Sequence, residues 1–96
     1  MYKVAAISDL ANGVNTGAIL PLKVIMSLEK PNEVPVSFLV VDSRLTHAVV
    51  SFYNTNKELK DKIAAEDLLY IKNPQLIFTS VEFKTRQYSY NCIKVA

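Results

Sequence analysis

The sequence predicts a mainly β domain in which three strands are followed by one short helix and then by two more strands. Several segments alternate apolar and polar side chains, and these segments recur roughly every ten residues. Helical spacing of apolar residues occurs in only one place. The chain has 96 residues, of which 50% are hydrophobic and 21% charged, and this suits a single globular domain.

The amino-terminal segment is mixed in character. Its two glycines, Gly13 and Gly17, lie in turn-forming stretches rich in asparagine. We therefore expect residues 1–17 to be a linker or amino-terminal tail, and residues 18–96 to form the folded domain.

Three strands are expected in the first half of this domain. Residues 18–28 alternate with the period of a strand, and residues 35–41 are rich in β-branched and aromatic side chains. Residues 46–53 form the third strand. Its inward set is Ala48, Val50 and Phe52, so the alternation turns His47 and Tyr53 outward. A single outward histidine is typical of an ordinary surface residue.

The pattern changes once, over residues 54–65. Leu59 and Ile63 lie four residues apart, and an asparagine or threonine precedes them as a cap, so this segment predicts a short helix. Strands resume at Leu68. Pro74 cannot donate a hydrogen bond to a neighbouring strand and marks a bulge or an edge.

A last strand is expected over residues 88–95. Three strands, a helix and two strands are the connectivity of the OB-fold, a five-stranded Greek-key barrel with its helix between strands 3 and 4. Small barrels often bend at glycine, and no glycine follows Gly17, so the bends would need bulges. An SH3-like or sandwich domain is the alternative.

The net charge of +2 does not by itself establish a surface for nucleic acid or membrane. Eleven Lys and Arg residues stand against nine Asp and Glu, so any basic site must be a local patch. One cysteine, Cys92, and one histidine cannot form an internal disulfide or a Cys/His zinc site, and we expect Cys92 to be a free thiol. No phosphate-binding loop or catalytic motif occurs. We expect no enzyme activity, no metal, no cofactor and no membrane segment.

One stretch, residues 83–90, combines cations with aromatic rings. It falls on the hairpin between the last two strands, which OB-folds use for ligand binding. Lys84 and Arg86 would contact phosphate, and Tyr88 would stack on a base. We add Arg44, from the loop after the second strand, and Tyr53, on the face of the third.

Two readings of this stretch stay open. The tyrosines can instead pack in the barrel, with the cations serving only solubility. The loop at residues 29–33 carries two acids and one base, which weakens the case for nucleic acid. The alternative function is a protein–protein interaction platform without nucleic-acid binding.

Several segments taken together resemble the carboxy-terminal OB domain of the tetratricopeptide repeat protein 5 family. They are the run from Val34 to Ser43, the run from Ala48 to Asn54, Asn73 to Leu76, Tyr88 to Tyr90 and Ile93 to Val95. The resemblance covers about residues 20–95.

The resemblance implies an adaptor rather than an enzyme. Members of this family are nuclear and cytoplasmic transcriptional cofactors of the stress response. Their OB domain is implicated in contact with DNA or chromatin, in support of coactivator complexes. Their helical repeats dock at the ribosome and act in the autoregulated decay of tubulin messenger RNA. We find no repeat of that kind in this sequence and expect no tubulin recognition from it.

Overall fold

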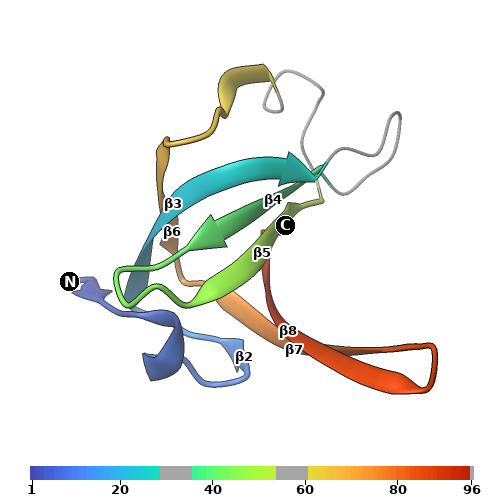
Figure 1. Ribbon diagram of the computed structural model, residues 1–96. Helices are drawn as coiled ribbons and strands as arrows, with labels where there is room; N and C mark the ends of the chain where they lie inside the picture. Colours follow the sequence, from blue (N-terminus) through green and yellow to red (C-terminus); the bar gives the residue numbers. More distant parts are fainter. Residues whose placement is uncertain (29–35, 54–60, 96) are drawn as a thin grey trace.

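The computed structural model describes residues 1–28, 36–53 and 61–95, and the account below concerns these residues. They form eight strands and one short 3-10 helix (Figure 1). In chain order the elements are β1 (Lys3–Val4), η1 (Ile7–Asp9), β2 (Gly13–Val14), β3 (Ala18–Leu28), β4 (Val36–Val41), β5 (His47–Phe52), β6 (Leu68–Lys72), β7 (Gln75–Phe83) and β8 (Arg86–Val95).

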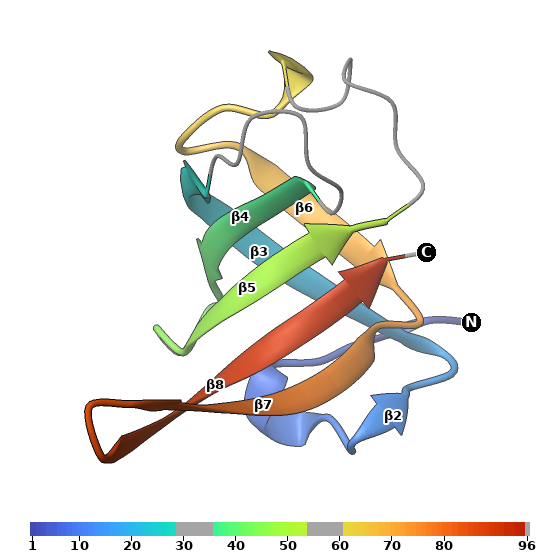
Figure 2. The ribbon, with the colours of Figure 1, turned by 90° about the vertical axis from the view of Figure 1, so that its right-hand side faces the viewer.

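The strands belong to one curved sheet, seen from the side of β5, β7 and β8 in Figure 2. Its order is β1-β3-β4-β5-β8-β7-β2, and β6 pairs with β3. The pairs β1–β3 and β5–β8 are parallel, whereas the other pairs are antiparallel. The mainly β prediction is confirmed.

The closed five-stranded barrel is a wrong prediction, because the sheet has eight strands and is not closed. The stretch from Leu68 to Phe83, which was expected to be one strand, forms two strands, β6 and β7. β6 pairs with β3 and β7 pairs with β8, and only Asn73 and Pro74 separate them. Asn73 has a φ of 51°, a left-handed conformation that turns the chain here. The interruption expected at Pro74 is therefore present.

The predicted helix at residues 54–65 lies mainly outside the described residues. In its described part, 61–65, Asp61 and Lys62 have helical backbone and residues 63–65 do not. Bending without glycine does occur on β3, where the pairing with β4 shifts register between Val24 and Met26. Such an irregularity bends a strand in the way that a bulge does.

The core lies on the concave side of the sheet. Alternate residues of β3, β4 and β5 supply most of it, and Ala48, Val50 and Phe52 point inward as the alternation predicts. Phe38 is fully buried and meets Phe52 edge to face, with ring centroids 6.1 Å apart. The full buried cluster is Ile7, Leu20, Leu22, Val24, Phe38, Val40, Ala48, Val50, Phe52, Leu76 and Ile93.

The segment expected as a linker packs on this body. β1 lies beside the start of β3, β2 lies beside β7, and Ile7 of η1 is only 3% exposed within the core. Asn15 donates from its side-chain amide to the carbonyl of Pro74, 3.1 Å away. Residues 1–17 thus share the core and the sheet of the domain.

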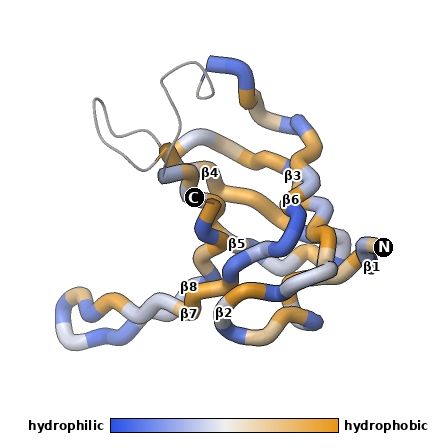
Figure 3. The backbone as a smooth tube through the Cα atoms, turned by 180° about the vertical axis from the view of Figure 1, so that it is seen from behind, coloured by the Kyte–Doolittle hydropathy of each residue, from blue (hydrophilic) through white to orange (hydrophobic). Residues whose placement is uncertain are grey.

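The hairpin of β7 and β8 extends beyond the body as a two-stranded ribbon (Figures 1 and 2). From Ser80 to Tyr90 every residue is exposed. Hydrophilic and hydrophobic residues alternate along this ribbon, which lies at the lower left of Figure 3. The ribbon carries most of the residues that the sequence marks as a candidate site.

Candidate functional site

The tip of the ribbon is a two-residue turn. Lys84 and Thr85 have φ values of 48° and 63°, the left-handed pair that favours a tight hairpin with the natural twist of the strands. From Gln75 opposite Lys94 to Phe83 opposite Arg86, the pairing of β7 and β8 runs without a register shift. Because directly paired residues share a face, the register fixes the two faces of the ribbon.

One face of the ribbon is apolar and aromatic. It carries Val81 and Phe83 from β7 and Arg86, Tyr88 and Tyr90 from β8. The exposed fractions of Val81, Tyr88 and Tyr90 are 46%, 50% and 41%.

The opposite face of the ribbon is more polar. It carries Ser80, Glu82, Gln87 and Ser89, and the hydroxyl oxygens of Ser80 and Ser89 lie 3.3 Å apart. The only carboxylate of the ribbon, that of Glu82, is therefore on the other side from the tyrosines.

The aromatic face continues onto the body along β8. Ile93 is fully buried, so the residues on either side of it point outward. The outward side of β8 therefore reads Arg86, Tyr88, Tyr90, Cys92 and Lys94, which we call the β8 strip.

Tyr53 lies at the body end of the β8 strip. Its backbone N–H donates to the carbonyl of Val95 at 2.9 Å, and the Nζ of Lys94 lies 5.0 Å from the centroid of the Tyr53 ring. This geometry is a cation–π contact. The strip thus has a cation and an aromatic ring at each end.

Among the described residues, the charge on this side of the molecule is of one sign. The described outward positions of β4, β5 and β8 hold no carboxylate, whereas the strip has Arg86 and Lys94 and the turn adds Lys84. A local field can thus be positive although the whole chain carries a net charge of only +2.

The predicted site residues divide into two groups. Tyr53, Arg86 and Tyr88 lie along the β8 strip or at its end, and Lys84 is at the ribbon tip, with its Nζ 5.4 Å from the Phe83 ring centroid. Arg44 does not join them. It lies in the loop between β4 and β5, on the opposite side of the body from the ribbon tip (Figure 1).

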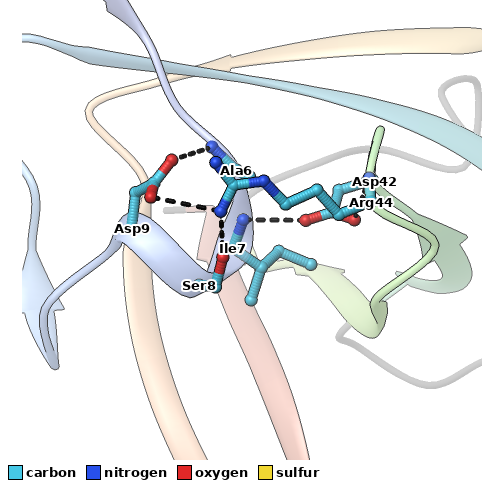
Figure 4. Close-up of polar contacts among 6 residues, drawn as sticks. All are labelled: Ala6, Ile7, Ser8, Asp9, Asp42 and Arg44. Carbon is cyan, nitrogen blue, oxygen red and sulfur yellow. Dashed lines mark hydrogen bonds and ion pairs between the residues drawn. The ribbon is translucent and has the colours of Figure 1, made fainter.

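Arg44 instead contacts the amino-terminal segment (Figure 4). We call the group of polar contacts among Ala6, Ile7, Ser8, Asp9, Asp42 and Arg44 the tail clasp. The Nη1 of Arg44 donates to the hydroxyl of Ser8 at 2.7 Å and lies 3.4 Å from the Oδ1 of Asp9. Asp9 also accepts from the backbone N–H of Ala6, and this hydrogen bond is the main reason why the pKa of the Asp9 carboxyl is lowered.

Asp42 joins the two sides of the tail clasp. Its carboxylate is buried and accepts three backbone N–H groups, those of Ile7, Arg44 and Thr46, each at 2.9 Å. The first bond spans 35 residues of sequence and fixes η1 against the β4–β5 loop. The role of Asp42 visible here is structural.

The prediction from sequence omitted three residues of the strip, Tyr90, Cys92 and Lys94. A signal was available, because alternation through the last strand puts all three on the side of Tyr88. Within the described residues, no cluster of three or more His, Cys, Asp or Glu side chains could hold a metal ion. The same part of the chain has no helix long and apolar enough to cross a membrane.

The whole chain, residues 1–96, matches the family described as the tetratricopeptide repeat protein 5 OB fold domain. The chain belongs to this family. It is 33% identical over 89 residues to Tetratricopeptide repeat protein 5 of Homo sapiens and 32% identical over 89 residues to that of Bos taurus. In both comparisons the match covers 93% of this chain and 20% of the relative, so the chain spans about a fifth of the length of these curated relatives.

The resemblance drawn from the sequence is thereby confirmed. The chain is an OB-fold domain of the kind found in a tetratricopeptide repeat protein, and its β8 strip and ribbon correspond to the last strand and last hairpin of the expected fold. The family match itself assigns no ligand to the strip.

Proposed function

We propose that this domain is a non-catalytic binding module whose β8 strip holds single-stranded nucleic acid. The observation that supports the proposal is the composition of the strip, in which two tyrosines lie between two cations and no carboxylate interrupts them. Tyrosine rings stack on bases of any sequence, at roughly 1–3 kcal/mol for each base, while cations contact the phosphates.

The length of the strip suits a short oligonucleotide. Arg86 and Lys94 are eight positions apart on one strand, which at about 3.3 Å per residue separates them by roughly 26 Å. A single OB fold holds about four nucleotides or more, and a strip of this length is comparable. Lys84 at the turn extends the charged region beyond Arg86.

Such binding should be weak and sensitive to salt. Each phosphate contact to a single strand contributes about −0.7 to the slope of log K against log salt concentration. The three cations Lys84, Arg86 and Lys94 therefore predict a slope of about −2.

The test is a fluorescence anisotropy titration of labelled oligothymidine at several salt concentrations. Arg86→Ala combined with Lys94→Ala should reduce the slope by about 1.4, while Tyr88→Ala should weaken binding about tenfold or more without changing the slope. Arg44→Ala is the matched control, since Arg44 is an exposed cation outside the strip, and it should leave binding unchanged.

Two results would reject the assignment. The first is an affinity that the double substitution leaves unchanged. The second is a loss of binding on Arg44→Ala as large as that on Arg86→Ala. Tighter binding to duplex than to oligothymidine would indicate recognition of the phosphate backbone alone.

The family suggests the setting in which this module works. We propose that it serves a transcriptional cofactor of the nucleus and cytoplasm, with contact to DNA or chromatin and with protein partners in coactivator complexes. Membership of a tetratricopeptide repeat protein family supports the protein partners, because such repeats bind peptides and other proteins. Co-precipitation with chromatin, lost on Tyr88→Ala, would be the matching result in cells.

A further inference from the structure

The ribbon has a strand edge that is free over half its length. β8 pairs with β7 from Arg86 to Lys94, but on its other side it pairs with β5 only from Cys92 to Val95. Among the described residues, no strand lies beside the segment from Arg86 to Asn91 on that side. We call residues 87–91 of this side the β8 edge.

The register shows which backbone groups the β8 edge presents. A two-residue turn places a hydrogen bond between Phe83 and Arg86, and along an antiparallel pair bonded and non-bonded residues then alternate. The N–H and C=O groups of Arg86, Tyr88 and Tyr90 are thus directed to β7. Those of Gln87, Ser89 and Asn91 are directed away from it.

The body of the sheet agrees with this assignment. The carbonyl of Val95 accepts from Tyr53 at 2.9 Å, so an odd-numbered residue of β8 faces β5. Since no register shift intervenes between Val95 and the ribbon, the odd-numbered residues of the β8 edge face the same way.

The β8 edge lacks the features that usually protect a free strand edge. Natural edges are blocked by proline, bulges or charged side chains. The segment from Arg86 to Asn91 has no proline and no bulge, and its only charge is at its end, on Arg86. Three N–H donors, those of Gln87, Ser89 and Asn91, are left for another strand. Only two C=O acceptors are left, those of Gln87 and Ser89, because the parallel pairing of Val49 with Cys92 uses the carbonyl of Asn91.

We propose that the β8 edge takes up an extended peptide of a partner protein as an additional strand, in line with β5. Recognition would rest on main-chain hydrogen bonds to Gln87, Ser89 and Asn91, the mode known as β-augmentation. The inference does not depend on nucleic-acid binding, because the peptide would be held mainly by backbone groups at the edge, whereas the oligonucleotide would be held by side chains of the β8 strip.

The neighbouring side chains define the chemistry of the peptide. On one face its residues would lie beside Tyr88 and Tyr90, which favours β-branched or aromatic side chains there, and an acidic residue would pair with Arg86. On the other face they would lie beside Gln87 and Ser89, which favours threonine or serine. The opposite edge of the ribbon is flanked by Glu82, which repels an acidic peptide.

The probe for this site is an acetylated ten-residue peptide that alternates valine or tyrosine with threonine and has glutamate at both ends. Its binding to the full chain is measured by isothermal titration calorimetry. Ser89→Pro removes an N–H from the β8 edge without removing any bond to β7, and we expect it to weaken binding at least tenfold. A peptide methylated on alternate backbone nitrogens should bind at least tenfold more weakly than the probe.

The chain offers a matched control. Ser80 lies directly opposite Ser89, and its backbone N–H points to the other edge of the ribbon. Ser80→Pro introduces the same ring at the same height and should change the affinity less than twofold. Circular dichroism spectra of both variants check that the hairpin is retained.

Amide hydrogen exchange provides a readout on the unaltered chain. Peptide binding should slow exchange at Gln87, Ser89 and Asn91 at least tenfold, whereas Tyr88 and Tyr90, already bonded to β7, should change little.

Three results would overturn the proposal. They are loss of binding on Ser80→Pro but not on Ser89→Pro, equal protection of all five amides, and a concentration-dependent dimer in light scattering that Ser89→Pro abolishes. The last result would mean that a second copy of this chain, and not a partner peptide, binds at the β8 edge.

Discussion

Replacing Asp42 with alanine should remove the carboxylate that joins the amino-terminal segment to the β4–β5 loop. The bond to Ile7 is the most costly to lose, because Asp42 and Ile7 are 5% and 3% exposed and the N–H is left without a partner. An unsatisfied buried donor costs about 1–3 kcal/mol. The N–H groups of Arg44 and Thr46 are only partly buried, so water can replace the carboxylate at roughly 1 kcal/mol for the two.

The total for Asp42→Ala is then about 2–4 kcal/mol, compared with roughly 5–14 kcal/mol expected for the whole stability of a domain of this size. The assay is urea denaturation followed by far-ultraviolet circular dichroism, since the chain has no tryptophan. Asp42→Asn keeps one acceptor oxygen and should fall between the alanine variant and the unaltered protein. The exposed neighbour Ser43 serves as the control, with Ser43→Ala expected to change little.

The reasoning about Asp42 would be refuted by an alanine variant within about 0.5 kcal/mol of the unaltered protein, the range of an ordinary surface substitution. It would also be refuted if hydrogen exchange at the Ile7 amide were as slow in Asp42→Ala as before. That result would mean that another group satisfies this N–H.

Four further outcomes follow from the same structure. Arg44→Ala should cost less than about 1 kcal/mol in urea denaturation, because the Arg44 and Asp9 side chains are 60% and 48% exposed. The lowered pKa of Asp9 contributes stability that is present at neutral pH and is lost as the pH falls below about 3.9, and Asp9→Asn should remove this part of the pH dependence. Asn73→Ala should cost about 1–2 kcal/mol in thermal melting, because alanine tolerates the left-handed backbone poorly, and Asn73→Gly should cost less. Phe38→Ala should cost about 3–5 kcal/mol by the same measurement, since the ring is fully buried.

The strands of the body could be predicted because their alternation reports burial directly. In β5, Ala48, Val50 and Phe52 pack into the core, while His47 and Tyr53, at the two ends, are exposed. Apolar side chains at every second position of the sequence predict this burial. The same alternation occurs in the ribbon. There the apolar side, with Val81 and Tyr88, faces solvent, so a periodic pattern alone could not show that the hairpin leaves the body.

The amino-terminal segment gave no signal of this kind. β1 and β2 have two residues each, which is too short for a period to be read. Their positions depend on distant groups instead, above all on the bond from the N–H of Ile7 to Asp42. For the same reason Arg44 looked available as a binding cation, since the sequence does not reveal its partners Ser8 and Asp9.

The sequence predicts where the pairing is interrupted after β6, but not which strands pair on either side of the interruption. Pro74 indicates that pairing stops, because it has no N–H to donate. It does not indicate that the segments before and after it pair with different strands, β3 and β8. The change of partner depends on contacts between Asn73 and the start of β3. The N–H of Asn73 donates to the carbonyl of Ala18, the first residue of β3, at 2.9 Å, and the Oδ1 of Asn73 accepts from the N–H of Gly17 at 2.8 Å.

Unlike the rest of the fold, the ribbon is not stabilised by the buried core. The buried cluster ends at Leu76 on β7 and at Ile93 on β8, so the part between them adds nothing to the core. A two-stranded hairpin alone is only marginally stable in water. Folding therefore does not account for the exposed apolar face with Val81, Tyr88 and Tyr90, and such patches mark interaction sites.

The two proposed ligands use different parts of the ribbon. An oligonucleotide would lie over the tyrosine rings of the β8 strip, while a peptide strand would lie beside them at the β8 edge. The one group that both need is the guanidinium of Arg86, which would contact a phosphate in one complex and an acidic side chain in the other. Saturating peptide should therefore leave oligonucleotide stacking intact but reduce the salt slope by about 0.7, the share of one phosphate contact. Full competition would instead mean that the peptide lies over the tyrosine rings and not at the edge.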